Sequence, residues 1–394
     1  MEHDFSWLIM PTCTQKFFSD FWQKKPSVLC SNRENHYQGL FDMGALESLI
    51  EYSQPKPPSI RIVKAQPKDE ISVPYYPNGR INIDKVRQYY MNGYTVILNS
   101  VENYNAKVSQ LTRAIENQLR SRVQVNCYLT PASSQGFRPH YDTHDVFVAQ
   151  IEGEKCWKVY SEELACPLNR MYDGEAVLKE AVDPSREVRL KPGDLLYIPR
   201  GWIHEAATLD EASLHITISL HPPLAVDLLY SVIEELIAKY PQFRQAMPIG
   251  SISERPSTKA TREQFNNLLN ILKNEAELDG ALDRIEGEII ARGRSGGDGR
   301  AFYDANEINN IQPSTKLIRR YHLPCRIISL SDTEIGLRFL GALIKGPNSF
   351  EDAMNFVINQ VSSFYVADIP NLPEEHQCVF AMSLVKDGLC TIET

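Results

Sequence analysis

The chain has 394 residues, enough for two or three domains of ordinary size. Hydrophobic residues make up 43% of it and charged residues 23%, which is the balance of a folded globular protein and not of a disordered one. The formal net charge of −9 argues against bulk binding of nucleic acid or of anionic membranes and leaves basic partners open.

No run of about 18 apolar residues occurs, so no segment is expected to span a membrane. The first residues, Met1 to Asp4, lack the basic region and the apolar core of a secretory signal. The eight cysteines lie far apart without a C-x-x-C pair, which is typical of reduced thiols and argues against a zinc ribbon or a disulfide framework. These features predict a cytoplasmic protein, or a nuclear or nucleolar one in a eukaryote.

The N-terminal part of the chain mixes helical and irregular patterns. Residues 14–25 place four aromatic side chains on one helical face, with Thr14 as a cap and a proline directly after the segment as the stop. Residues 54–79 are rich in proline and are expected to be irregular. Residues 83–120 contain two helical patterns around a short strand, 94–98.

From residue 123 to residue 221 the pattern changes to short runs of β-branched and aromatic residues with turn signals between them. One turn is the segment 191–194 (KPGD), which has proline and glycine at the central positions of a type II turn. Closely spaced strands without helices between them favour an antiparallel sandwich or barrel. The expected strands cover residues 123–129, 145–151, 156–160, 194–198 and 214–220.

Beyond residue 223 the helical period returns. Amphipathic helices long enough to pack on each other are expected at 225–240, 262–273 and 275–292. The segment 293–300 (GRSGGDGR) that follows them is the best linker candidate in the chain.

The C-terminal part, 313–394, is expected to form a compact unit. Three helical patterns, at 332–345, 350–363 and 373–387, precede a strand at 388–392. Helices followed by a small β element indicate a winged-helix domain.

The most informative segment is GFRPHYD, which ends with His140, Tyr141 and Asp142. In an extended chain residues two apart face the same side, so His140 and Asp142 converge. With one further histidine from a neighbouring strand they would form a 2-His-1-carboxylate facial triad, which holds Fe(II) by three ligands and leaves the other positions open. His204, in the segment PRGWIH, follows a strand and a turn that bring it back, and it is the preferred third ligand.

Other interpretations of these residues stay open. His140 could be a surface histidine after a proline turn, and Asp142 a simple turn former. His215 is the alternative third ligand, although its place between Leu214 and Ile216 in an apolar strand is more typical of a buried, hydrogen-bonded histidine.

A 2-oxo acid bound at the open metal positions would need a buried cation for its distal carboxylate. Lys155 is a candidate because it opens an expected strand, although a lysine at a strand start is usually solvated. Asn126 and Tyr128 share one face of the strand 123–129 and could donate neutral hydrogen bonds to the same ligand.

Residues 128–160 (YLTPASSQGFRPHYDTHDVFVAQIEGEKCWKVY) and 190–206 (LKPGDLLYIPRGWIHEA) closely resemble the JmjC-type 2-oxoglutarate oxygenases, and specifically the ribosomal oxygenases. Residues 21–26 (FWQKKP) are similar to the start of that family, and a looser similarity extends over the whole chain. The resemblance implies a mainly β core, a double-stranded β-helix of the cupin/JmjC type, with an α-helical dimerisation region and a C-terminal winged-helix domain.

The same resemblance implies where the domains begin and end. A JmjC catalytic domain with N-terminal helical elements would cover residues 1–223. A helical dimerisation region would cover 224–300, and a winged-helix-like domain 301–394.

The resemblance also implies roles for individual residues. The triad of His140, Asp142 and His204 would bind Fe(II) and be catalytic. The cosubstrates would be 2-oxoglutarate and O₂. The residues implied to bind 2-oxoglutarate are Lys155, which would pair with its C5 carboxylate, and Asn126, Tyr128 and Ser219.

Three positions depart from the family pattern and are expected at the substrate rim. Related sequences often have an acidic residue directly after the H-x-D aspartate, whereas Thr143 and His144 follow here. His144 shares a face with the two ligands and would lie at the substrate mouth or at a solvated strand edge. Arg138 stands where a small or apolar residue is common, and Trp202 is bulky. These changes leave the identity of the substrate open.

The sequence therefore predicts a 2-oxoglutarate-dependent dioxygenase that hydroxylates a protein side chain, with a basic ribosomal protein as the expected substrate of an acidic enzyme. One alternative keeps this chemistry on a modified peptide, a tRNA base or a methyl-lysine tail. The other is a non-catalytic regulator that binds nucleic acid through basic residues of 313–394, which the net charge of −9 disfavours. The apolar faces of the helices between 225 and 292 predict a homodimer.

Overall fold

The computed structural model divides the chain into two compact units, which are described separately. The N-terminal unit runs to His221, and the C-terminal unit takes up the chain at Pro222. The linker expected at 293–300 lies outside the described residues except for its last two positions. The described residues are 3–30, 33–172, 183–253, 255–292, 299–320, 323–339 and 341–393.

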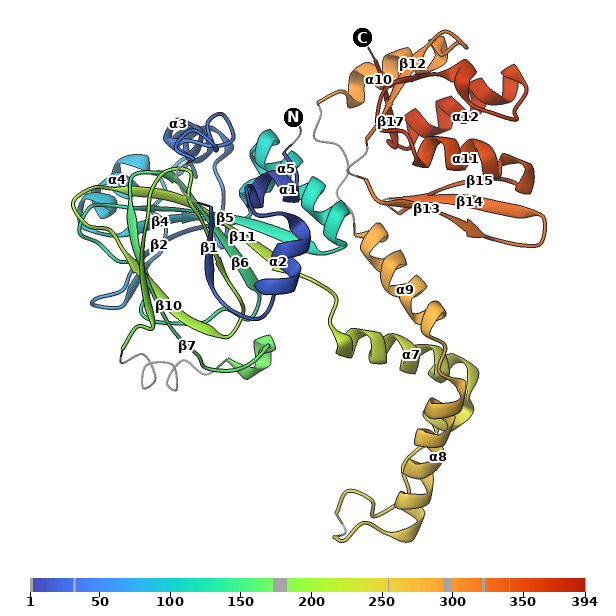
Figure 1. Ribbon diagram of the computed structural model, residues 1–394, viewed down its shortest axis with the longest axis horizontal. Helices are drawn as coiled ribbons and strands as arrows, with labels where there is room; N and C mark the ends of the chain where they lie inside the picture. The colour runs from blue at the N-terminus through green and yellow to red at the C-terminus, as the bar shows by residue number, and fades with distance from the viewer. Residues whose placement is uncertain are drawn as a thin grey trace. The chain divides into compact units, whose positions relative to one another are not determined.

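The N-terminal unit is built around two antiparallel sheets (Figure 1). The larger has eight strands in the order β1-β9-β6-β11-β5-β4-β2-β3, and the smaller has three in the order β10-β7-β8. The strands are β1 (Ser27–Cys30), β2 (Ile60–Lys64), β3 (Asp69–Ile71), β4 (Thr95–Leu98), β5 (Arg122–Thr130), β6 (Asp145–Glu152), β7 (Lys155–Glu162), β8 (Arg186–Leu190), β9 (Leu195–Ile198), β10 (Trp202–Ala207) and β11 (Ser213–His221).

The two faces of the large sheet differ in polarity, and this difference positions the site. On β5, Val125 and Cys127 belong to the main hydrophobic core, as do Ile216 and Ile218 on β11. Residues of opposite parity on these strands face the other side, because successive side chains of a strand alternate. The second face therefore carries the polar side chains of both strands.

Helices cover the apolar face of the large sheet. Phe5 of α1 and Phe17 of α2 are fully buried and make edge-to-face ring contacts with each other, and both contact Phe147 of β6. Such aromatic pairs add about 0.5–1.5 kcal/mol each beyond the burial of area. The helices of this unit are α1 (Phe5–Ile9), α2 (Thr14–Asp20), α3 (Met43–Ser48), α4 (Ile83–Met91) and α5 (Ala106–Leu119), with shorter helical turns at Leu49–Ser53, Val101–Asn103 and Asn169–Met171.

Most of the expected elements of this unit are confirmed, and two are wrong in detail. The helix expected at 14–25 ends at Asp20, and Thr14 is its first residue instead of its cap. The segment 54–79 is not irregular, because its prolines flank the strands β2 and β3 without interrupting them. β2 completes the large sheet by pairing with β4.

The C-terminal unit begins with three helices, α7 (Ala225–Lys239), α8 (Lys259–Glu275) and α9 (Leu278–Ala291), close to the expected bounds. Val232 and Leu236 of α7 pack with Ala281 of α9 in a small core. No residue of α8 is buried by the part of the chain that the structure describes, and Phe265 is 59% exposed. Phe265 therefore has little cover within the described chain.

The rest of this unit combines two three-stranded sheets with two longer helices. The helix expected at 332–345 is wrong: Ile335, Leu337 and Phe339 are buried at every second position, which is the period of a strand. The elements are α10 (Ala301–Glu307), β12 (Lys316–Arg319), β13 (Cys325–Ser329), β14 (Glu334–Phe339), β15 (Ala342–Pro347), α11 (Glu351–Ile358), β16 (Phe364–Tyr365), α12 (Glu374–Lys386) and β17 (Cys390–Ile392).

Among the described residues, none of the helices has both the length and the apolar character that crossing a membrane requires.

The turn expected at 191–194 is present and depends on Gly193. Its φ is +90°, as the third position of a type II turn requires, and the Asp194 amide donates to the Lys191 carbonyl over 2.9 Å. A Cβ at Gly193 would lie 1.9 Å from the carbonyl oxygen of Arg33. We therefore expect Gly193→Ala to lower the free energy of unfolding of the N-terminal unit by about 2–3 kcal/mol.

Gly79→Ala is the matched control, because Gly79 has a φ of +79° but nothing within 4 Å of the added Cβ. It should cost only about 1 kcal/mol. All four tryptophans lie before residue 222, so their fluorescence during urea unfolding reports on the N-terminal unit. Equal shifts of the urea midpoint in both variants would contradict the expectation that a Cβ at Gly193 clashes with the Arg33 carbonyl oxygen.

Candidate metal centre and its cavity

Three side chains that the sequence predicted as ligands lie together. The ligand atoms of His140, Asp142 and His204 are all within 4.8 Å of one another. His204 Nε2 lies 3.6 Å from Asp142 Oδ2, and the two imidazole centroids are 4.5 Å apart. Ligands about 2 Å from a shared divalent ion have separations of this size. The donor set of two imidazoles and one carboxylate therefore fits a transition metal.

Backbone hydrogen bonds hold the two ligand segments side by side. His140 and His204 form an isolated antiparallel bridge, with N–O distances of 3.0 and 2.8 Å between their backbones. The Gly201 amide donates to the Asp142 carbonyl over 2.9 Å. His204 is on β10, whereas His140 and Asp142 lie in the extended segment before β6. The side chains converge because the main chains are paired.

The orientation of each imidazole is fixed by a carbonyl two residues earlier. His140 Nδ1 is 2.9 Å from the carbonyl oxygen of Arg138, and His204 Nδ1 is 2.9 Å from that of Trp202. A carbonyl can only accept, so each Nδ1 must carry the proton. Nε2 of both rings is thereby left with its lone pair free for a metal.

The charge states of the ligands also suit a metal. Burial, reinforced by the His140 ring, lowers the pKa of His204 to about 4. Burial by itself would raise the pKa of Asp142, but the surrounding imidazoles of His144, His204, His140 and His221 together hold it below its usual value. Neutral imidazoles and an ionised carboxylate are the forms that bind a metal ion.

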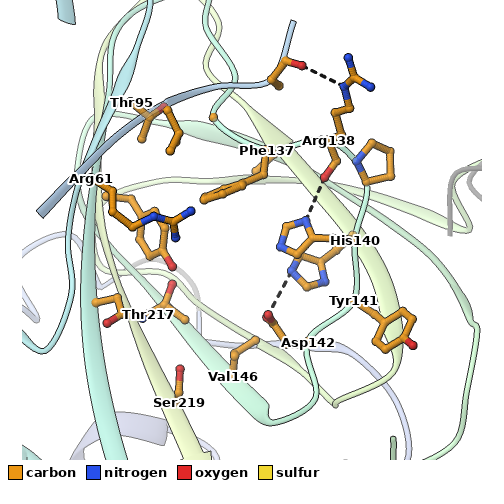
Figure 2. A pocket seen from close by; sticks show the side chains of 18 of the residues that line it. Arg61, Thr95, Phe137, Arg138, His140, Tyr141, Asp142, Val146, Thr217 and Ser219 are labelled. Atoms are coloured by element: carbon orange, nitrogen blue, oxygen red, sulfur yellow. Dashed lines mark hydrogen bonds and ion pairs between the residues drawn. The ribbon is translucent and has the colours of Figure 1, made fainter. Parts of the chain in front are cut away.

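The triad lies on the wall of a cavity of about 1430 Å³ (Figure 2). The polar faces of β5 and β11 contribute Asn126, Tyr128, Thr217 and Ser219 to the lining. Figure 2 shows Thr217 and Ser219 across the cavity from His140 and Asp142. β7 contributes Lys155. All four residues that the resemblance assigned to 2-oxoglutarate therefore line the same cavity as the triad.

Lys155 is a buried cation without an anionic partner in the described chain. Its side chain is only 4% exposed, and Nζ donates to Thr130 Oγ1 over 2.8 Å. Burial lowers its pKa from 10.5 to about 7. A buried ammonium is costly unless an anion pairs with it. The position is therefore suited to bind an acid that enters the cavity.

The three expected rim residues behave differently. His144 lines the cavity, and its ring lies 4.7 Å from that of His221. Arg138 also lines it, and its Nε donates to the Ala65 carbonyl over 3.0 Å. Trp202 is not among the described residues that line the cavity. Its carbonyl instead orients His204.

The structure also places residues that the sequence did not single out. Arg61, on β2, points into the cavity, and its guanidinium lies 5.7 Å from the centre of the Phe137 ring (Figure 2). Its Nε donates to Glu70 of β3 over 2.8 Å. Thr217 of β11 lines the cavity, and Thr130 of β5 accepts the hydrogen bond from Lys155. Arg61 and Glu70 were not predicted as cavity residues because the segment 54–79 was expected to be irregular, whereas it contains β2 and β3.

Comparisons with known proteins agree with this geometry. Residues 98–228 match the family model of the JmjC domain. The bifunctional lysine-specific demethylase and histidyl-hydroxylase NO66 of Branchiostoma floridae is 33% identical over 304 residues, which cover 73% of this chain and 46% of that protein. Ribosomal oxygenase 1 of Danio rerio is 26% identical over 431 residues, which cover 98% of this chain and 78% of that protein. The chain spans about half the length of the NO66 relatives.

Solved structures show the same fold. The Escherichia coli ribosomal oxygenase YcfD matches with a TM-score of 0.59 and 17% identity, covering 97% of this chain and 98% of that one. YcfD in complex with cobalt and 2-oxoglutarate matches with a TM-score of 0.57 and 15% identity, covering 96% and 98%. As the sequence predicted, the chain carries a JmjC domain and has the mainly β fold of a ribosomal oxygenase.

Proposed function

We propose that this protein is an Fe(II)- and 2-oxoglutarate-dependent oxygenase that hydroxylates a side chain of a protein, with a ribosomal protein as the substrate. One observation supports this above the others. Two imidazoles with free Nε2 lone pairs and one carboxylate meet on the wall of a cavity that also contains a buried lysine with no anionic partner among the described residues. A metal and an acidic cosubstrate need these two features together.

The residues have separate tasks in this proposal. His140, Asp142 and His204 hold Fe(II), which together with 2-oxoglutarate and O₂ would supply the power to oxidise a C–H bond, with succinate and CO₂ as co-products. Lys155 pairs with the distal carboxylate of 2-oxoglutarate. The enclosing sheets exclude water from the reaction. Asn126, Tyr128 and Ser219 donate further hydrogen bonds to the cosubstrate.

The names of related proteins support this activity. NO66 is named a histidyl-hydroxylase and a lysine demethylase, and the Danio rerio relative is named a ribosomal oxygenase. YcfD is described as a ribosomal oxygenase and was solved with cobalt and 2-oxoglutarate. We carry over from them the metal, the cosubstrate and the ribosomal substrate.

The charge around the cavity favours an uncharged target side chain over a methylated lysine. The described lining includes the cations Arg61, Lys64, Lys68, Arg138 and Arg170, in addition to Lys155. Apart from the ligand Asp142, its acids are Asp69, which accepts from the Tyr94 hydroxyl, and Glu70, which pairs with Arg61. The net charge of −9 favours the encounter of the whole protein with a basic partner. The lining of the cavity, in contrast, carries more cationic than acidic side chains.

The C-terminal unit is proposed to serve assembly. We propose domain limits at 223 and 300, a homodimer formed by the helices between them, and a winged-helix-like domain at 301–394 supported by α11, α12 and β17. Cytoplasmic location stays a prediction.

The basic cluster of this unit does not support a nucleic-acid regulator. Arg320 pairs with Asp304, and Arg326 pairs with Asp283 and Glu286. Arg319 donates to the Leu323 carbonyl, and Lys316 lies 3.3 Å from Glu393. These cations are already engaged within the chain.

The activity is tested by incubating the protein with ribosomes, Fe(II) and 2-oxoglutarate. Succinate should form, and one ribosomal protein should gain the mass of one oxygen atom. His140→Ala and Asp142→Ala should abolish the product and weaken Co(II) binding by more than about 100-fold. Mutation of a residue that only hydrogen-bonds to a metal ligand already lowers metal affinity by about 10- to 100-fold, and loss of a ligand itself should cost more. Co(II) absorption spectra measure the second effect.

His376→Ala is the control, because His376 is on α12 of the C-terminal unit. It should keep both Co(II) binding and turnover. Product formation that survives His140→Ala unchanged would contradict the assignment of the metal centre.

A pH dependence follows from Lys155, whose pKa is about 7 in the free protein. An added carboxylate favours the protonated form, whereas carboxylates with a pKa near 4 stay ionised throughout the neutral range. The affinity for 2-oxoglutarate should therefore be constant below pH 7 and fall by up to about tenfold per unit above it.

Calorimetry of 2-oxoglutarate binding to the Co(II)-loaded protein measures this effect. At pH 8 the heat in buffers of different ionisation enthalpy should reveal proton uptake. Lys155→Arg stays protonated and should show no uptake. Binding without proton uptake in the unmodified protein would rule out the pairing with Lys155.

The proposed dimer predicts an effect of a charge on α8. Phe265→Asp, at a residue 59% exposed, should convert the dimer to a monomer, because a charge in an apolar interface must be desolvated. Val361→Asp, at a residue 90% exposed outside the three helices, should not. Light scattering after size exclusion gives both masses, and a Phe265→Asp dimer would exclude α8 from the interface.

A further inference from the structure

His215 is a buried polar side chain that the proposed chemistry does not yet use. It is 2% exposed and lines the cavity, and it is not part of the cluster of metal ligands. Its Nδ1 is buried without a hydrogen-bond partner in the part of the chain that the structure describes. An unpaired buried polar atom costs about 1–3 kcal/mol and needs an explanation.

Two aromatic rings fix the orientation of His215. The ring of Tyr128, its cross-strand neighbour on β5, is stacked on it at 4.8 Å with an interplanar angle of 5°. Trp157 of β7 contacts it edge-on, at 5.5 Å and 78°. The imidazole therefore cannot turn freely toward another partner. A hydrogen bond made by it would come from a group that enters the cavity.

His215 lies next to the proposed anion site. The positive charge of Lys155 acts on it, and together with burial, the larger effect, it lowers the pKa of His215 well below 6.5. The ring is therefore neutral, and a neutral imidazole carries one N–H donor. It can donate beside a lysine without adding a second buried charge.

Two other side chains that line the same cavity, Lys155 and Ser219, also have hydrogen-bonding groups without a partner in the described chain. In its protonated form Lys155 Nζ has three protons, and its hydrogen bond to Thr130 Oγ1 uses one of them. Ser219 Oγ is buried without a partner in the described chain. A carboxylate supplies two oxygens with about four acceptor positions, which matches this set of unused donors.

We propose that His215 is a binding residue for the distal carboxylate of the acidic cosubstrate, to which its N–H donates beside the ammonium group of Lys155. The site thus recognises a dicarboxylate by one charged donor, Lys155, and by neutral donors, of which His215 is one. This inference rests on the proposed function, because that function supplies the acid that enters the cavity.

The test compares two 2-oxo acids that differ only in the distal carboxylate. Calorimetry gives the affinity of the Co(II)-loaded protein for 2-oxoglutarate and for 2-oxopentanoate, and the ratio of the two isolates the distal site. His215→Phe keeps an aromatic ring between Tyr128 and Trp157 but removes the N–H. We expect its ratio to fall by about 10- to 100-fold, the effect of a hydrogen bond to a charged group, with 2-oxopentanoate affinity unchanged.

A second readout needs no metal. Succinate should bind to the metal-free protein in NMR titrations, and His215→Phe should weaken it by the same factor. His215→Leu repeats both measurements with a side chain that cannot stack, and circular dichroism identifies the variants that fold.

The outcomes separate the two proposals. If the unmodified protein does not prefer 2-oxoglutarate over 2-oxopentanoate, the proposed function and this inference both fail. If it does, and a folded His215 variant keeps the full preference, this inference alone is overturned. An equal loss of affinity for both 2-oxo acids would also overturn it, because that result indicates a structural role for the ring.

Discussion

The site depends on one short piece of backbone pairing, the bridge between His140 and His204. This bridge is not part of a longer ladder, and with the Gly201 amide bound to the Asp142 carbonyl it joins two segments about sixty residues apart in the chain. The backbone conformation at residue 201 requires glycine, because φ is +86° there and a Cβ would lie 1.9 Å from the Leu164 carbonyl oxygen. The local carbonyls then set both imidazole tautomers. Backbone hydrogen bonds thus determine which nitrogen atoms face the metal position.

The cavity beside this bridge follows from the alternation of side chains on β5 and β11. One face of each strand is apolar and packs in the core, as Val125 and Ile216 do. The other face carries polar residues such as Asn126 and Thr217, and it lines the cavity. A shift of register by one residue would exchange the two faces, so the burial of the apolar face also fixes the polar one. The strand register that stabilises the sheet therefore also places the binding groups.

The local motifs of the site were predictable from the sequence, whereas features set by long-range pairing were not. The ligands could be found because H-x-D and the later histidine lie in short strings whose geometry is local. Arg61 could not, because it reaches the cavity only through the sheet order β5-β4-β2. The segment around Leu337 has apolar residues at spacings compatible with a helix, and its pairing with β13 and β15 decides for a strand. The three-domain division and the winged helix remain predictions.

The polar interior has a cost that bears on how the protein responds to its ligands. Lys155 on β7 of the smaller sheet, and His215 and Ser219 on β11 of the larger one, are buried with donors or acceptors that the described chain leaves unused, which destabilises both sheets. An apolar wall would pack as well without this penalty. In the proposed function an acid that occupies the cavity would remove this penalty and would therefore stabilise the folded N-terminal unit by mass action. The groups that weaken the fold are therefore those to which we assign the selection of the ligand, so the proposed binding accounts for polar side chains that folding does not require.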